Sequence, residues 1–330
     1  MEKSVEVLFT QSILDRLLVC FQLEGMVRKL GDFENYVFEV NREGKPLILR
    51  ITHSSHRNRT EIEAELGWMN FLYKNKVNCS EVIPLSSGEF IQTVNAADGT
   101  SFYGCLFSKV KGEPVKMNSK QYNEELFYSW GKEIGKMHLV TKQYQPKKGE
   151  SLRPYWYEEE LLRVEDLFPH DPEIIENTEQ LIKELRELPR NRNNFGLIHS
   201  DIHSGNFFFD GEEIHVFDFD DSCYLWFVSD IAIPLYYSLF YGYNHAKEDE
   251  KTVFSLLFLT HFTRGYEVYH PLPEKWKEQL SLFLRLRDIT LYSVFHKKIA
   301  PEDRSEQLNQ ILVELRRRII LKEAIVQKLF

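Results

Sequence analysis

The stretch HSDIHSGNFFFDGEEIHVFDFDD, residues 199–221, restricts the possible folds of this chain more than any other segment. It reads as a polar loop, an apolar strand, a glycine-containing turn and a second short strand. A hairpin brings its two ends together, so Asp201 and Asn206 at the start and Asp218 at the exit should converge on one small volume. The segment therefore predicts a compact polar site built on a β-hairpin.

The three side chains offer carboxylate and amide oxygens, which suit a hard cation such as Mg²⁺. Mg²⁺ in proteins usually bridges to the phosphates of a substrate, so ATP and Mg²⁺ are the expected cofactors. The spacing also has a known chemical use. An aspartate, an asparagine five residues later and an Asp-Phe pair after a hairpin make the kinase pattern H-x-D-x-x-x-x-N followed by D-F. Every spacing of that pattern fits this segment.

These residues resemble the catalytic loop of the superfamily that contains aminoglycoside phosphotransferases, choline kinases and type II homoserine kinases, which usually reads H-G-D-x-H-x-x-N. His203 favours this branch over the eukaryotic protein kinases. The resemblance implies an α+β, protein-kinase-like fold of two lobes, with a small antiparallel β-sheet in the N-lobe and a larger, mainly helical C-lobe. It also implies that Asp201 accepts the proton of the acceptor hydroxyl, while Asn206 and Asp218 hold Mg²⁺.

The resemblance also implies accessory roles. Asp220 is expected to assist the metal or the acceptor site, and Asp230 in VSDIA to hydrogen-bond the backbone of the catalytic loop. His203 is expected to shape the loop, because neutral imidazole is a poor match for Mg²⁺. The chain departs from the usual loop at Ser200, where glycine is common, and at Ser204, where proline is common.

Two other interpretations are possible for the acidic residues of this segment. Asp and Asn are frequent in exposed turns, and for Asp210 this simple interpretation is accepted. The triplet Asp-Ile-His at 201–203 also matches dinuclear-metal phosphoesterases, in which metals activate a water. That class needs G-D-x-x-D and G-N-H-[DE] segments along later strands, and the sequence after Asp230 has neither. The kinase interpretation is therefore favoured.

The front third of the chain has the pattern expected of a lobe that covers a nucleotide. The segments MVRKL, NYVFEV and PLILRIT are separated by the turn-like GDFE and NREGK, which predicts an antiparallel meander. An amphipathic helix with Thr10 as its N-cap is expected before them, and a second helix over residues 59–75 after them. Two further strands are expected at 89–94 and 102–110.

Within PLILRIT, strand alternation places Ile48 and Arg50 on the same face. In the kinase pattern V-A-I-K an apolar residue touches adenine and a lysine two positions later touches the phosphates, and Ile48 and Arg50 hold these two places. Arginine stays charged and binds phosphate or carboxylate bidentately. The expected partner of Arg50 is Glu65, with Glu61 as the substitute. Alternatively, Glu65 borders the core and reaches solvent.

The predicted lobes meet at YGCLFSKVKGEP. Residues 1–107 are expected to form the ATP-covering N-lobe and residues 108–114 the hinge. Residues 115–330 are expected to form the helical C-lobe with the catalytic loop and the acceptor pocket. The backbone groups expected to bind the adenine edge are those of Phe107, Ser108 and Lys109.

The sequence is least specific about the acceptor pocket. The aromatic and acidic residues of 153–160 fit either a wall for an amine-bearing substrate or the packing of a helix start. The tyrosines of 236–243 leave the same choice, and residues 285–288 fit either acceptor contacts or a buried ion pair. His138 is interpreted as a core histidine, and the basic run 316–318 as the solvated face of a terminal helix.

Composition bounds the partners and the location. A formal net charge of −9 argues against nucleic acid or an anionic membrane surface as a partner. The four cysteines are far apart and show no C-x-x-C spacing, so reduced thiols and a cytoplasmic location are expected. The longest apolar run, residues 231–241, is about half of the roughly 20 residues that a membrane helix needs. The oligomeric state stays open.

Together these patterns predict an ATP- and Mg²⁺-dependent phosphotransferase that acts on a hydroxyl of a small molecule, such as an amino alcohol, an amino acid, a sugar or an aminoglycoside. A bacterial Ser/Thr protein kinase of the same fold is one alternative, although no recognisable phosphorylatable activation segment follows Asp218. A catalytically silent nucleotide-binding module is the other. The intact Asp201, Asn206 and Asp218 argue against it.

Overall fold

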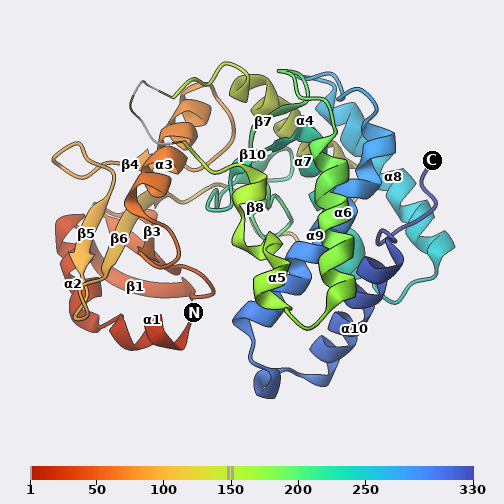
Figure 1. The fold of residues 1–330 in the computed structure, drawn as a ribbon. Helices are drawn as coiled ribbons and strands as arrows, with labels where there is room; N and C mark the ends of the chain where they lie inside the picture. The colour runs from red at the N-terminus through yellow and green to blue at the C-terminus, as the bar shows by residue number, and fades with distance from the viewer. Residues whose placement is uncertain (1, 147–148, 150–151) are drawn as a thin grey trace. The chain divides into compact units, whose positions relative to one another are not determined.

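The computed structural model describes residues 2–146, 149 and 152–330 (Figure 1). They divide into two compact units, one within Met1–Lys111 and Tyr144–Arg153, the other within Gly112–Gln143 and Pro154–Phe330. The first unit is built on an antiparallel sheet and the second is mainly helical, so the predicted α+β class is confirmed. That these units are the predicted N- and C-lobes stays a prediction.

The sheet of the first unit contains the predicted meander. Its strands run in the order β1-β2-β3-β6-β4, with β5 also paired to β6, and the pairings are antiparallel. The two-residue β4 was not predicted, because so short a strand shows no alternation. The strands are β1 (Glu24–Gly31), β2 (Tyr36–Arg42), β3 (Lys45–His53), β4 (Val82–Ile83), β5 (Gln92–Asn95) and β6 (Ser101–Ser108).

The helices that the described residues of this unit form are α1 (Lys3–Leu8), α2 (Gln11–Cys20) and α3 (Arg59–Lys74). Thr10 holds the predicted N-cap position of α2, but its side chain makes no capping hydrogen bond. In α3 the helical spacing of Ile62, Leu66, Met69 and Tyr73 predicts one buried stripe, and the first three are buried, but Tyr73 is 39% exposed, so the prediction was wrong there. The helix begins with a reciprocal capping box in which Asn58 and Glu61 bond each other's backbone.

Alternate residues of β3 face opposite sides of the sheet. Leu49 and Ile51 are buried in a cluster that includes Leu17 of α2, whereas Arg50 between them bonds to Glu65 of α3. The two helices therefore cover opposite faces. This arrangement separates an apolar layer on one side from a buried charged pair on the other.

The second unit holds two short two-stranded sheets among its helices. β7 (Phe195–Ile198) pairs with β10 (Cys223–Trp226), and β8 (Phe207–Phe209) pairs with β9 (Ile214–Val216), both antiparallel. Only the second pair was predicted. The helices are α4 (Glu124–Thr141), α5 (Val164–Leu167), α6 (Pro172–Arg186), α7 (Phe227–Gly242), α8 (Glu248–Tyr266), α9 (Trp276–Lys298) and α10 (Glu306–Leu321), with short 3₁₀ turns at Trp156–Glu158, Glu160–Leu162 and Pro301–Asp303.

Glycines allow α4 and α8 to pack with their backbones almost in contact. A Cβ atom on Gly131 would lie 1.8 Å from the carbonyl oxygen of Phe262, and one on Gly265 would lie 1.9 Å from that of Tyr128. Side chains at these positions would push the helices apart. Among the described residues, no helix has both the length and the apolar character that spanning a membrane requires.

Candidate active site

The loop His199–Asn206 joins β7 to β8, and the two ends of the hairpin meet there as predicted. The N–H of Phe217 donates to the carbonyl oxygen of Asn206 at 3.0 Å. Nε2 of His199 donates to the carbonyl oxygen of Phe217 at 3.1 Å. Asp218 follows Phe217 directly, so its backbone leaves the hairpin beside both ends of the loop.

Asp201 and Asn206 lie in direct contact. The Asn206 side-chain nitrogen donates to the carbonyl oxygen of Asp201 at 2.9 Å and to its carboxylate Oδ2 at 3.0 Å. The amide nitrogen is thus used to orient the carboxylate, and the amide oxygen is the atom left for a cation. Asp218 is exposed, and its backbone has a φ of 63°. Two oxygen donors of the type that Mg²⁺ prefers therefore sit at the two ends of the hairpin.

The backbone explains one departure from the usual loop sequence. Ser200 has a φ of 67°, in the left-handed region where glycine carries no steric penalty. The usual loop sequence has glycine at this position, and this chain adopts the left-handed φ with a serine.

Asp230, at the start of α7, binds the backbone of the loop through its side chain. Its carboxylate accepts the N–H of Ser200 at 2.9 Å and that of His199 at 3.2 Å, which is the contact expected from the sequence. Nε2 of His138 also donates to Asp230, at 3.1 Å, and Nδ1 of His138 accepts from the hydroxyl of Tyr266 at 2.8 Å. His138 is fully buried, as a core histidine should be, but it also belongs to this chain of hydrogen bonds.

Two residues contact Asp201: Arg287, from the 285–288 segment that the sequence left between acceptor contacts and a buried ion pair, and His203, which was expected to shape the loop. Arg287 of α9 donates through Nη2 to Oδ1 of Asp201 and to the hydroxyl of Tyr237 on α7. Nε2 of His203 lies 3.4 Å from the other carboxylate oxygen. Burial raises the pKa of Asp201, but the positive charge of Arg287 and the bond from His203 outweigh it, and the net pKa lies below the usual value. Asp201 is therefore ionised at neutral pH.

The first unit contains the expected Arg50–Glu65 pair. Nη1 and Nη2 of Arg50 donate to the two carboxylate oxygens of Glu65, each at 2.7 Å, and the side chains are only 6% and 0% exposed. The alternative that Glu65 reaches solvent was therefore wrong. Glu61 is used in the capping box of α3 instead. The guanidinium of Arg50 also lies 5.2 Å from the centre of the Phe107 ring.

The other residues expected near the nucleotide lie on the same sheet. Ile48 is half-buried and pairs with Phe107 across β3 and β6. The N–H of Ser108 donates to the carbonyl oxygen of Glu81 at 2.9 Å, so this donor is already committed within the unit. Lys109 extends its ammonium to Glu39, 3.2 Å away. Ile48 and Phe107 thus form an apolar surface beside Arg50.

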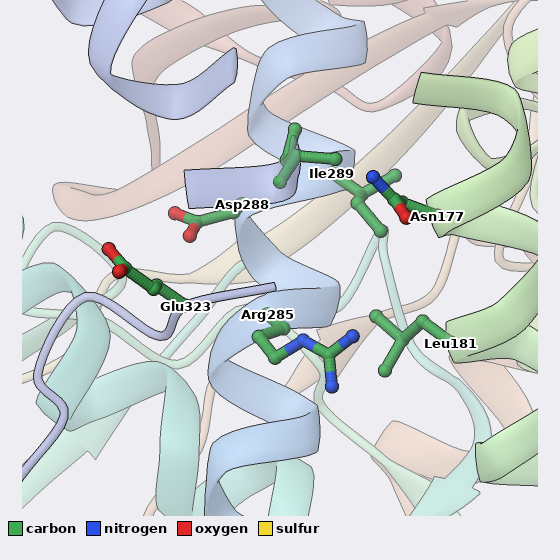
Figure 2. A pocket seen from close by; sticks show the side chains of 7 residues that line it. Asn177, Leu181, Arg285, Asp288, Ile289 and Glu323 are labelled. Atoms are coloured by element: carbon green, nitrogen blue, oxygen red, sulfur yellow. The ribbon is translucent and has the colours of Figure 1, made fainter. Parts of the chain in front are cut away.

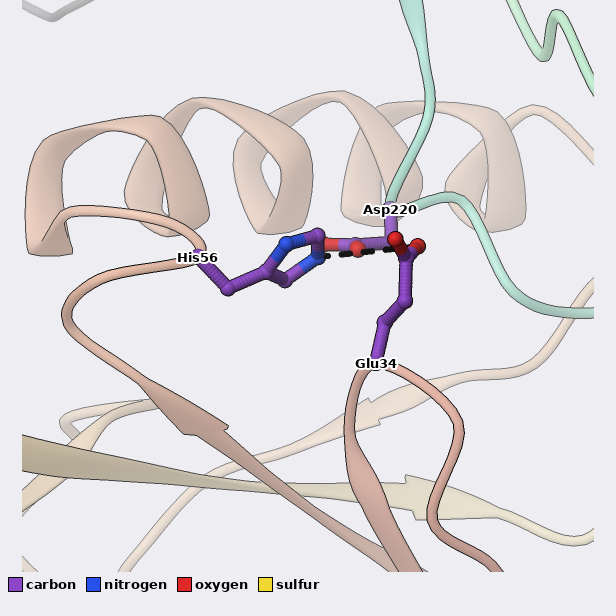
Figure 3. A group of neighbouring side chains, drawn as sticks. All are labelled: Glu34, His56 and Asp220. Atoms are coloured by element: carbon purple, nitrogen blue, oxygen red, sulfur yellow. Dashed lines mark ion pairs between the residues drawn. The ribbon is translucent and has the colours of Figure 1, made fainter. Parts of the chain in front are cut away.

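Glu34, His56 and Asp220 carry further atoms of the kind that bind metal ions. In the first unit, Nε2 of His56 lies 3.9 Å from a carboxylate oxygen of Glu34 (Figure 3). Asp220, in the second unit, is 4% exposed and lies in the turn before β10. Its accessory role at a metal or an acceptor stays a prediction.

The structure decides between the alternatives for the C-terminal helices. Asp288 pairs with Arg318 at 2.6 Å, and both side chains are buried, so the solvated interpretation of Arg318 was wrong. Burial of this arginine is compensated by two bonds to Asp288. Arg285 lines a small pocket between α6, α9 and α10 (Figure 2). Its side chain bonds Glu184 at 3.3 Å. Residues 285–288 therefore include both a buried ion pair and, through Arg287, a contact to Asp201.

The aromatic segment of 153–160 packs as a helix start. The N–H of Tyr155 donates to the carboxylate of Glu158 at 2.6 Å, and Trp156 is 3% exposed. The tyrosines of α7 divide between two environments. Tyr236 is buried against Asp288, whereas Tyr237 faces Arg287.

Comparison with known proteins adds independent findings. The model of the phosphotransferase enzyme family matches residues 27–269. An amicoumacin kinase of Bacillus subtilis (strain 168) is 35% identical over 297 residues, which cover 90% of this chain and 87% of that protein. A solved amicoumacin kinase, hAmiN, in complex with AMP-PNP, Ca²⁺ and Ami has a TM-score of 0.92 at 31% identity, covering 99% of this chain and 98% of the other.

A microcompartment-associated aminopropanol kinase is more distant, with a TM-score of 0.75 at 20% identity, and covers 94% of this chain and 95% of its own. At that identity the likeness concerns the fold. The predicted superfamily resemblance and the protein-kinase-like fold are confirmed by these matches.

Proposed function

Because the chain belongs to the phosphotransferase enzyme family and is a small-molecule kinase, we propose that it transfers the γ-phosphoryl group of Mg²⁺-bound ATP to a hydroxyl of its acceptor, with Asp201 as the general base. The observation that carries the proposal is the contact between Asp201 and Asn206, on a loop whose backbone is held by Asp230. This contact orients an ionised carboxylate at the position that the kinase pattern assigns to the base.

Asp201 would receive the proton of the acceptor hydroxyl as the oxygen attacks the γ-phosphorus. The O–H bond breaks, a bond from oxygen to the γ-phosphorus forms, and the bond from that phosphorus to the bridging oxygen of ADP breaks. Asn206 and Arg287 bond the two carboxylate oxygens of Asp201. The carboxylate is therefore already oriented for proton transfer, which favours the reaction.

Asn206 and Asp218 would hold the metal. An amide oxygen and an exposed carboxylate are hard ligands, and few protein ligands are usual where Mg²⁺ keeps waters and substrate phosphates. The ion, when bound, neutralises charge that builds up on the phosphates. In the first unit, Arg50 would contact phosphate while Glu65 fixes its side chain, and Ile48 would pack on adenine.

Amicoumacin is the first acceptor to test, because the relative named for it is 35% identical over most of both chains. Amino alcohols, sugars and aminoglycosides complete the panel. A protein substrate and a silent nucleotide-binding module are the alternatives that the same assay decides. The cytoplasmic location and the absence of nucleic-acid partners stay predictions.

The test measures ADP release with each acceptor for the wild type, for Asp201→Asn and for the control Asp210→Asn. Asp210 lies in the exposed hairpin turn, and its carboxylate bonds His215 of β9. We expect acceptor-dependent turnover that Asp201→Asn lowers by about a thousand-fold or more and that Asp210→Asn leaves within about two-fold. Binding of AMP-PNP by calorimetry should survive both substitutions. Turnover that persists in Asp201→Asn would refute the base. Nucleotide binding without turnover of any acceptor would favour the silent module, and phosphorylation of proteins alone would favour the protein kinase.

A further inference from the structure

Arg287 makes more contacts around Asp201 than an ordinary surface arginine would. Nη2 donates to Oδ1 of Asp201 and to the hydroxyl of Tyr237, and Nε donates to the same hydroxyl at 3.1 Å. The guanidinium carbon lies 4.9 Å from the centre of the Tyr237 ring. The arginine side chain is 18% exposed. Its remaining nitrogen, Nη1, donates to none of the residues that the structure describes.

We propose that Arg287 is a positioning residue for the base and that its Nη1 recognises an oxygen of the acceptor next to the reacting hydroxyl. This inference rests on the proposed function. It deepens that function because it assigns the acceptor a chemical class: molecules that carry a second oxygen on the carbon adjacent to the phosphorylated hydroxyl, as in a 1,2-diol.

The positioning role follows from the two oxygens of Asp201. Oδ2 accepts from Asn206 at 3.0 Å and Oδ1 accepts from Arg287, so the carboxylate is held against rotation from both sides. Each carboxylate oxygen has two acceptor sites. A lone pair therefore remains on Asp201 for the proton of the acceptor. Tyr237 fixes the guanidinium in turn, because its hydroxyl accepts from two arginine nitrogens.

The recognition role follows from the planar shape of the guanidinium. Nη1 and Nη2 are bonded to the same carbon and point in nearly parallel directions. When Nη2 faces the base, Nη1 faces the space beside it. An acceptor whose hydroxyl reaches Asp201 would present a neighbouring oxygen to Nη1, since oxygens on adjacent carbons have a similar separation. A hydrogen bond from a charged donor corresponds to a preference of about ten- to hundred-fold.

The experiment compares 3-amino-1,2-propanediol with 1-amino-2-propanol, which share the amine and differ by one oxygen, and uses amicoumacin as a third acceptor. The variants are Arg287→Met, Arg287→Lys and the control Arg285→Met, which removes an arginine on the same helix that bonds Glu184. Steady-state kinetics give kcat and KM separately for each acceptor.

For the wild type we expect kcat/KM to favour the diol by about ten- to hundred-fold. Arg287→Met should lose this preference and lower kcat by about a hundred-fold, while the KM for ATP stays within about two-fold. Arg287→Lys, which keeps the charge without the fork, should recover part of kcat but not the preference. Arg285→Met should behave as the wild type. A purely structural role would not change the choice between the two amino alcohols.

Thermal unfolding separates this inference from the proposed function. If the pair exists, the loss of Tm in the double variant Asp201→Asn, Arg287→Met is smaller than the sum of the losses in the two single variants. Additive losses, an unchanged or raised kcat in Arg287→Met, or the absence of any wild-type preference for the diol would each overturn the inference. Coupled losses in an enzyme that phosphorylates no acceptor would instead overturn the proposed function.

Discussion

Ser200 separates the catalytic-loop histidine from the proposed base in a backbone conformation that disfavours side chains. Its φ of 67° costs a non-glycine residue about 1–2 kcal/mol. Replacing it by glycine removes this cost, but the greater entropy of glycine in the unfolded chain lowers stability by about 0.5–1 kcal/mol. We predict that Ser200→Gly raises the free energy of unfolding by up to about 1 kcal/mol and leaves kcat unchanged. Urea denaturation and the ADP-release assay measure the two quantities.

Ser204→Gly is the matched control, because Ser204 lies in the same loop without a positive φ. Glycine there should lower stability by up to about 1 kcal/mol. If Ser200→Gly also lowered the free energy of unfolding, the prediction would be wrong. The serine side chain would then stabilise the fold by more than its left-handed backbone conformation destabilises it.

The cluster around Asp201 was predicted because its members are near in the chain, whereas Asp230, 30 positions from Ser200, was predicted from the family resemblance. Asp201 and Asn206 are five positions apart, and the hairpin brings Phe217 and hence Asp218 to them, so spacing alone indicates the cluster. Arg287 is 86 positions from Asp201. The sequence named residues 285–288 as acceptor contacts or a buried ion pair, but no local pattern assigns Arg287 to Asp201. Only the fold reveals it.

At the scale of elements, the close packing of α4 and α8 supports the loop indirectly. α4 carries His138, which bonds Asp230, and Gly131 on the same helix lets α8 approach. We predict that Gly131→Ala lowers the free energy of unfolding by about 3 kcal/mol or more. A Cβ would lie 1.8 Å from the carbonyl oxygen of Phe262, and relieving this clash would require the backbone of α4 or α8 to move. Urea denaturation gives the change.

Gly242→Ala is the control for helix propensity. Its Cβ would meet only the flexible end of Met117, at 2.4 Å. We therefore expect a change within about 1 kcal/mol of the wild type, with the propensity of alanine partly offsetting the contact. Equal effects of the two substitutions would contradict the packing of α4 on α8.

At the scale of the whole molecule, the sequence predicted the elements that are long or regularly patterned. The three-stranded meander and α3 were found because alternation and helical periodicity extend over many residues. β7 and β10 were missed although they are longer than β8 and β9, because the turn at Asp210-Gly211 marks the hairpin of β8 and β9 in the sequence and no such turn joins β7 to β10. The described residues within Tyr144–Arg153 belong to the first unit although the chain has already entered the second, and no local signal predicts such a return.

Buried histidines make the stability of the whole molecule depend on pH. Burial lowers the pKa of His270 to about 4, and it also lowers those of His53, His199 and His296. Each group is neutral in the folded chain at pH values where the unfolded chain already binds a proton. The unfolded state therefore takes up more protons below about pH 6.5, and stability falls as the pH decreases from there.

His270 is the group on which to test this, because its Nδ1 donates to the carbonyl oxygen of Pro271 at 2.7 Å and its ring packs near Phe227 and His138. Asparagine keeps a donor at a similar place but does not titrate. We predict that His270→Asn, although less stable at pH 7.5, loses less stability between pH 6.5 and pH 4.5 than the wild type. The slopes of the free energy of unfolding against pH should differ by up to about 1.4 kcal/mol per pH unit, which corresponds to the uptake of one proton on unfolding. Urea midpoints and m-values at several pH values measure it, and parallel curves for the two proteins would show that His270 is protonated in the folded state.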